Sequence, residues 1–76
     1  MKVKLEIVEE WVGRNANEVP DERELKTILS ESLIIDGRTA RKVLREAMEQ
    51  YPPSFGYVHH GAIRHNGKTL FAYQDE

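Results

Sequence analysis

Apolar residues recur along this chain with two different spacings. Over the first fifty residues they return every three or four positions, which is the repeat of a helix with one buried face. In the last third, aromatic and β-branched residues stand close together on both sides of an Asn-Gly pair. The pattern therefore predicts three helices followed by a β-hairpin, a single α+β domain over residues 1–76.

The first segment is predicted to form a helix over residues 3–13. Its apolar side chains fall on one side at 100° per residue, with Glu6, Glu9 and Glu10 on the other. We expect Trp11 to lie in the core. Because residues 3, 5 and 7 also alternate as in a strand, a short opening strand is the alternative. The apolar positions of the helical pattern are Leu5, Ile7, Val8, Trp11 and Val12.

A second helix is predicted over residues 21–32. Asp21 is placed to accept from the free amides of the first turn, and Glu24 follows three residues later, as in a capping box. Pro20 stands just before it. An apolar stripe at helical spacing follows, made of Leu25, Ile28, Leu29 and Leu33.

The third predicted helix covers residues 36–51. Asp36 is its expected N-cap, and Pro52 and Pro53 end it because proline cannot continue the hydrogen-bond ladder. The inward side of this helix is predicted to carry Ala40, Val43, Leu44, Ala47 and Met48.

The hairpin is predicted from two strands, about 57–64 and 68–74, around the Asn66-Gly67 pair. Asn-Gly is the strongest short-range signal for a two-residue β-turn. A hairpin centred on this turn pairs Ile63 with Leu70 and Ala62 with Phe71, and it places His60 opposite Tyr73.

Residues 29–44 read Leu-Ser-Glu-Ser-Leu-Ile-Ile-Asp-Gly-Arg-Thr-Ala-Arg-Lys-Val-Leu. This segment resembles the helix-turn-helix core of winged-helix regulators of the GntR and MarR type. Together with the order of elements, the resemblance implies a winged helix-turn-helix domain, with Ile34 in its turn. It further implies a small transcriptional regulator or chromatin-associated factor that binds double-stranded DNA, with the third helix in the major groove and the hairpin as the wing.

The basic residues give this expectation a chemical basis. Arg38, Arg41 and Arg45 follow each other at i, i+3 and i+7, so they share one helical face, and arginine bonds bidentately to guanine. The expected DNA contacts on the third helix are Arg38, Thr39, Arg41, Lys42 and Arg45. Those on the hairpin are Arg64, His65 and Lys68.

The distribution of charge leaves other partners open. The formal net charge is -2, with nine acidic and five basic residues in the first 36 positions and six basic and four acidic residues after them. One alternative is a protein-interaction module that docks a partner on the acidic face of the first two helices. Another is a small phage or viral inhibitor protein without DNA contact. A third is that the basic row is only a solvated helix face. A homodimer is also open, because paired DNA half-sites require two copies.

Several classes of site receive no support. The chain has no cysteine, which excludes disulfides and thiolate zinc sites. His59 and His60 are adjacent and point to opposite faces of a strand, and His65 is too distant to complete a three-histidine metal site. No acidic residues are paired at a spacing for general acid and base work, and no serine or threonine lies in a nucleophile motif, so we do not expect an enzyme. We expect no cofactor either. No apolar run reaches about 20 residues and no signal-like segment opens the chain, so a cytoplasmic, nucleoid-associated protein is expected.

Overall fold

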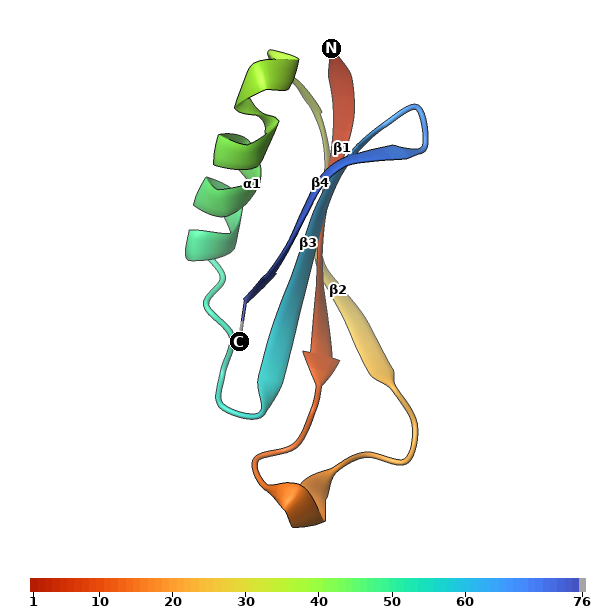
Figure 1. The fold of residues 1–76 in the computed structure, drawn as a ribbon, viewed down its shortest axis with the longest axis vertical. Coiled ribbons are helices and arrows are strands. Elements are labelled where there is room, and N and C mark those ends of the chain that lie inside the picture. Colours follow the sequence, from red (N-terminus) through yellow and green to blue (C-terminus); the bar gives the residue numbers. More distant parts are fainter. Residues whose placement is uncertain (76) are drawn as a thin grey trace.

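The computed structural model describes residues 1–75, and in this range it contains four antiparallel strands and one α-helix. Figure 1 shows the strands side by side in one sheet, with the helix along one face. The elements are β1 (Lys2–Trp11), β2 (Glu24–Ile34), α1 (Ala40–Glu49), β3 (Tyr57–His65) and β4 (Lys68–Asp75), with short 3-10 turns η1 (Ala16–Glu18) and η2 (Gly37–Thr39).

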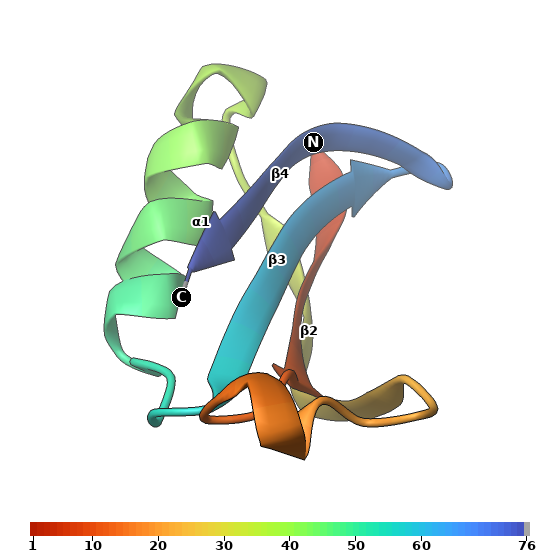
Figure 2. The same ribbon diagram turned by 60° about the horizontal axis from the view of Figure 1, so that its bottom comes forward.

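The strand order in the sheet is β2-β1-β3-β4. The two hairpins of the chain therefore lie beside each other, with β1 and β3 in the centre and β2 and β4 at the edges. The segment between β2 and β3 carries α1 onto one face of the sheet, as Figure 2 shows from a second direction. We call this the covered face and the opposite one the open face.

The predicted winged helix-turn-helix domain is wrong, because the first two predicted helices are strands. Residues 3–13 fit both patterns, and the strand alternative is the correct one. Val3, Leu5 and Ile7 alternate onto the covered face, where they are 2%, 3% and 0% exposed. Strand β1 is paired on both sides, so partners distant in the sequence outweigh the local helical repeat.

The second predicted helix is strand β2. Its helix-like spacing arises from a β-bulge at Ile28, which shifts the alternation within the strand. Leu29 and Leu33 lie opposite Ile7 and Val3, whereas Leu25 is 53% exposed. The capping box therefore caps no helix. The residue expected in the helix-turn-helix turn, Ile34, ends β2, and the predicted acidic face on two helices does not exist.

The third predicted helix exists in shortened form. Asp36 is an N-cap, but of the turn η2, where its side chain accepts from the amide of Arg38 at 3.0 Å. The α-helix itself covers Ala40–Glu49 and ends two residues before the predicted position. Ala40, Leu44 and Met48 are buried, as the inward pattern predicts.

The C-terminal hairpin is confirmed, but its predicted register is wrong. Asn66 and Gly67 have positive φ angles of 52° and 78°, as an Asn-Gly turn requires. A bulge next to Ile63 shifts the pairing, so this residue lies opposite Phe71 instead of Leu70. The same shift places Ala62 opposite Ala72 and His60 opposite Gln74.

The core lies between α1 and the covered face. The fully buried side chains are Ile7, Leu44, Met48 and Ile63. Trp11, predicted to be core, is only partly buried and contacts the ring of Tyr57, with 5.0 Å between the ring centroids. In the described part of the chain, α1 is too short and too polar to cross a membrane.

Candidate nucleic-acid interface

A glycine on β3 allows helix α1 to pack close to the sheet. A Cβ atom at Gly61 on β3 would lie 2.5 Å from Sδ of Met48 and 2.9 Å from Cδ1 of Leu44. The absence of a side chain at this position lets both apolar side chains reach the sheet. The opposite side of α1 is thereby fixed in position and faces solvent.

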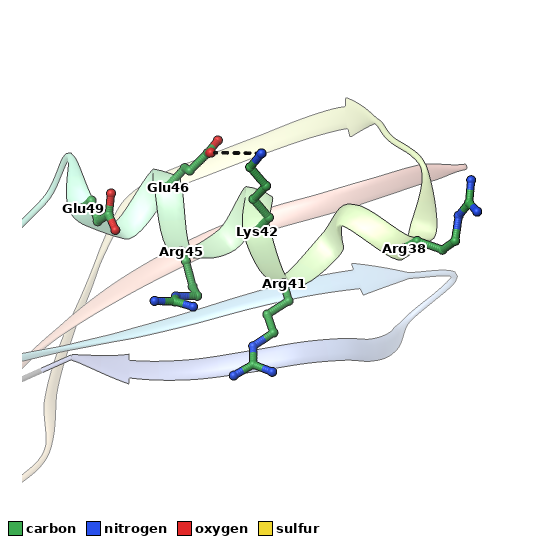
Figure 3. Close-up of a pocket in the computed structure, with 6 residues that line it drawn as sticks. All are labelled: Arg38, Arg41, Lys42, Arg45, Glu46 and Glu49. Carbon is green, nitrogen blue, oxygen red and sulfur yellow. Dashed lines mark ion pairs between the residues drawn. The ribbon is translucent and has the colours of Figure 1, made fainter.

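The predicted basic residues lie on the solvent side of α1 and, in the case of Arg38, on the preceding turn η2. They line an open groove of about 440 Å³ (Figure 3). Figure 3 shows Arg41 and Arg45 extending in the same direction from the helix, whereas Lys42 and Glu46 extend to the other side. The residues that line the groove are Arg38, Arg41, Lys42, Arg45, Glu46 and Glu49. We call Arg41 and Arg45 the arginine flank.

The arginine flank is free of carboxylate partners among residues 1–75. Arg41 lies over the ring of Phe71 on β4, with 5.4 Å from its Cζ to the ring centroid. This cation–π contact orients the guanidinium without neutralising its charge. Both side chains are exposed, so they are available to an anionic partner.

The other two cations of the predicted row are already paired. Arg38 donates to both carboxylate oxygens of Asp36, at 2.8 Å from its Nη2 to Oδ2 and 3.3 Å from its Nε to Oδ1. The hydrogen bond to Asp36 raises the pKa of Arg38, and the same guanidinium and the Arg38 amide lower the pKa of Asp36. Lys42 lies 4.0 Å from Glu46 one turn later. The expected row of four cations therefore reduces to two unpaired arginines.

Thr39 was predicted to face DNA, and its hydroxyl instead has a structural partner. Its Oγ1 donates to the main-chain carbonyl of Asp36 at 2.7 Å, which closes the turn before α1.

The predicted contacts on the hairpin do not join the arginine flank. Arg64 lies on the open face, where its Nη1 is 3.4 Å from Oε1 of Glu6. Nδ1 of His65 lies 2.7 Å from the carbonyl oxygen of Lys2, at the start of β1. Lys68 is exposed at the start of β4. These residues were predicted to form the wing, and that prediction is wrong because the fold is not a winged helix.

The fold separates charge along its length, which the sequence order conceals. Ile7, Leu29, Gly61 and Tyr73 form a row of paired residues across the sheet. Helix α1 passes over this row between Leu44 and Met48, and we divide it after Ala47. With that division, residues 1–7, 29–47 and 61–72 on one side of the row carry eight Lys and Arg side chains and four carboxylates. We call this the basic end, and the arginine flank belongs to it.

The other half of the described chain, residues 8–28, 48–60 and 73–75, carries eight carboxylates and only three cations. We call it the acidic end. Figure 1 shows how the separation arises, because the basic end gathers the start of β1, the start of α1 and the β3–β4 turn. Three of the four carboxylates at the basic end are already paired with cations: Glu6, Asp36 and Glu46.

Two histidines lie at the acidic end and were rejected above as a metal site. His59 points to the covered face and contacts Glu9, and His60 points to the open face, 2.7 Å from Oε1 of Glu10. Within residues 1–75 no three metal-ligating side chains converge. Sequence reasoning missed both His–Glu contacts, since they depend on the β1–β3 register.

No protein-family model matches the chain, and neither the curated proteins nor the solved structures that were compared with it include a similar protein.

Proposed function

We propose that this protein binds double-stranded DNA through the arginine flank of α1. The observation that carries the proposal is that Arg41 and Arg45 are exposed, point the same way and lack an ion-pair partner in the described chain. Two unpaired guanidinium groups on one rigid helix are suited to phosphate, which arginine binds with paired donors.

The spacing of the two arginines suits a nucleic-acid strand. Four residues of helix correspond to about 6 Å along its axis. Two successive phosphate steps on one DNA strand advance by about 7 Å along the duplex axis. The flank therefore matches two phosphates that lie two steps apart on one strand, at the edge of a groove, when α1 lies along the duplex axis.

The basic end supports the same partner at longer range. A cluster of positive charge on a body that is acidic elsewhere directs a polyanion to that cluster. Paired cations such as Arg38 and Lys42 contribute to this field less than the unpaired ones. We therefore expect two to four phosphate contacts, and a slope of log affinity against log salt between about -2 and -4.

Fluorescence anisotropy with a labelled duplex of random sequence, repeated over a salt series, tests the proposal. The double variant Arg41→Glu with Arg45→Glu is expected to lose binding at salt concentrations where the original protein is retained. The matched comparison is between two single variants, Arg45→Glu and Arg14→Glu. Each changes the net charge by the same amount, and Arg14 lies at the acidic end. Undiminished binding by the double variant, or no duplex binding at low salt, would show the proposal to be wrong.

A further inference from the structure

Strand β2 is an edge strand of eleven residues, and its outer side has no backbone partner among residues 1–75. It contains neither proline nor glycine. Long, uncovered edges are templates for pairing with another chain. We propose that two copies of this protein pair β2 with β2, around a two-fold axis perpendicular to the sheet, to form one continuous eight-stranded sheet.

The bulge at Ile28 gives β2 a self-complementary register. Pairing with β1 places Leu29 on the covered face and Thr27 on the open face, with Ile28 left between them. If Leu29 lies on the two-fold axis, each residue before the bulge pairs with a residue after the bulge in the other copy. The two side chains of every such pair point to the same face of the sheet. The resulting cross-strand pairs are Leu29 with Leu29, Ser30 with Thr27, Glu31 with Lys26, and Ser32 with Leu25.

Charges support this register. Lys26 and Glu31 lie on the covered face, are exposed and make no ion pair within the described chain. In the paired strands each Lys26 lies opposite a Glu31 of the other copy, once on each side of the axis. Opposite charges at directly paired positions stabilise an antiparallel pair, and like charges destabilise it. Edge charges that normally discourage association therefore favour it in this one arrangement.

A groove with both polar and apolar walls runs beside the same edge, and its polar side chains include Glu31, Glu46 and Gln50. It has a volume of about 240 Å³ and lies between β2 and α1, where Leu29, Val43 and Ala47 are only partly buried. A second copy brings its own Leu29 against the first, directly beside this groove. The association thus covers apolar surface that a single copy leaves in contact with water.

The charge separation along the body favours the same geometry. A two-fold axis perpendicular to the sheet makes the paired strands antiparallel. The basic end of each copy then lies beside the acidic end of the other. Opposite net charges face each other at both ends of the pair, which favours association most at low salt.

The other edge strand, β4, fits a second copy less well. Helix α1 extends over this edge, as the contact of Arg41 with Phe71 shows. A two-fold axis beside β4 would bring the arginine flanks of both copies toward each other, and their like charges would oppose the contact. The edge at β2 carries no such cluster.

Sedimentation equilibrium of the whole chain over a range of concentrations tests the inference, without nucleic acid. The original protein is expected to reach twice the mass of one chain, with a dissociation constant that rises with salt. The single variants Lys26→Glu and Glu31→Lys place like charges opposite each other twice, and each is expected to dimerise roughly tenfold more weakly. Lys68→Glu, on the other edge, is the control. It reverses the same kind of charge but has no charged partner directly across the two-fold axis, so it is expected to weaken the association much less than either variant.

An equimolar mixture of the two single variants is decisive. In a mixed pair both charge contacts are opposite in sign again, so the mixture is expected to recover the association that each variant alone has lost. Circular dichroism of each variant shows whether it is folded. A single-chain mass for the folded original protein at millimolar concentration overturns the inference, as does a mixture that stays as weak as its components. Because this test contains no DNA, its failure is distinct from a failure of the proposed function.

Discussion

His59 and Glu9 lie opposite each other on the two central strands, and Nε2 of the histidine is 3.0 Å from Oε2 of the glutamate. The second ring nitrogen, Nδ1, donates to the carbonyl oxygen of Tyr51 at 2.6 Å. Since a carbonyl oxygen only accepts, Nδ1 carries a hydrogen, and the contact with Glu9 requires a further proton between Nε2 and Oε2. The His59 side chain, 3% exposed, thus ties the end of the α1 segment to the centre of the sheet.

We predict that His59→Leu lowers the free energy of unfolding by about 2 kcal/mol, because the Tyr51 carbonyl and the Glu9 carboxylate both lose their partner. Denaturant unfolding at neutral pH measures this loss. Glu9→Gln is the matched control. Its amide donates to an unprotonated Nε2 and keeps both contacts of the ring, so its effect is expected to be clearly smaller. Equal losses in the two variants would contradict the hydrogen-bond assignment.

Gly61→Ala is expected to destabilise the protein by about 1–3 kcal/mol, since the new methyl group enters space held by Met48 and Leu44. The loss is measured by thermal or denaturant unfolding. Ala62→Ser, one position away on the open face, is the control and is expected to change stability little. A neutral Gly61→Ala variant would show that α1 is not packed this closely on β3.

Asp36→Asn is expected to strengthen duplex binding. The amide still accepts from the Arg38 main chain and so keeps the cap of η2, whereas Arg38 loses its ion pair and becomes available to phosphate. Anisotropy titrations are expected to show a salt slope steeper by about 0.9, the value for one additional phosphate contact. An unchanged slope would exclude Arg38 from the interface even when it is unpaired.

The carboxyl of Glu10 gives a prediction for pH. Its pKa lies below the ordinary value of 4.5, chiefly because Arg23 donates to it and additionally because of the contact with His60. The ionised form therefore favours the folded state above pH 4.5, and this contribution is lost as the pH falls through the lowered pKa. Arg23→Ala is expected to move the Glu10 pKa upward, as measured by NMR titration of the side-chain carboxyl carbon. No upward movement would show that Arg23 is not its main partner.

Local signals in the sequence predicted the elements that local interactions determine. The α1 segment has Asp36 before it and two prolines after it, and the hairpin has Asn66-Gly67 at its turn. These residues act within a few positions of themselves. The predicted basic face of α1 was for the same reason placed correctly on the solvent side.

The first two strands were mistaken for helices for two physical reasons. In β1, Leu5, Ile7 and Trp11 fit a helical repeat as well as an alternating one, and only pairing with β2 and β3 decides between them. In β2, the bulge at Ile28 turns an alternating pattern into an apparent helical stripe. The side-chain contacts differ in the same way. The ion pairs of Arg38 and Lys42 join residues close together in the sequence, whereas the His–Glu contacts join distant residues and depend on the β1–β3 register.

The opposite signs of the two ends have a kinetic consequence. Under the proposed function, a DNA strand exerts a turning force on a body whose charge is divided in this way, so the basic end is rotated toward the DNA during approach, before any side chain touches it. Encounters that begin with the wrong end forward are corrected in solution. Added salt shortens the range of this rotation. We therefore expect the association rate, measured by stopped flow, to fall more steeply with salt than the small net charge of the chain suggests.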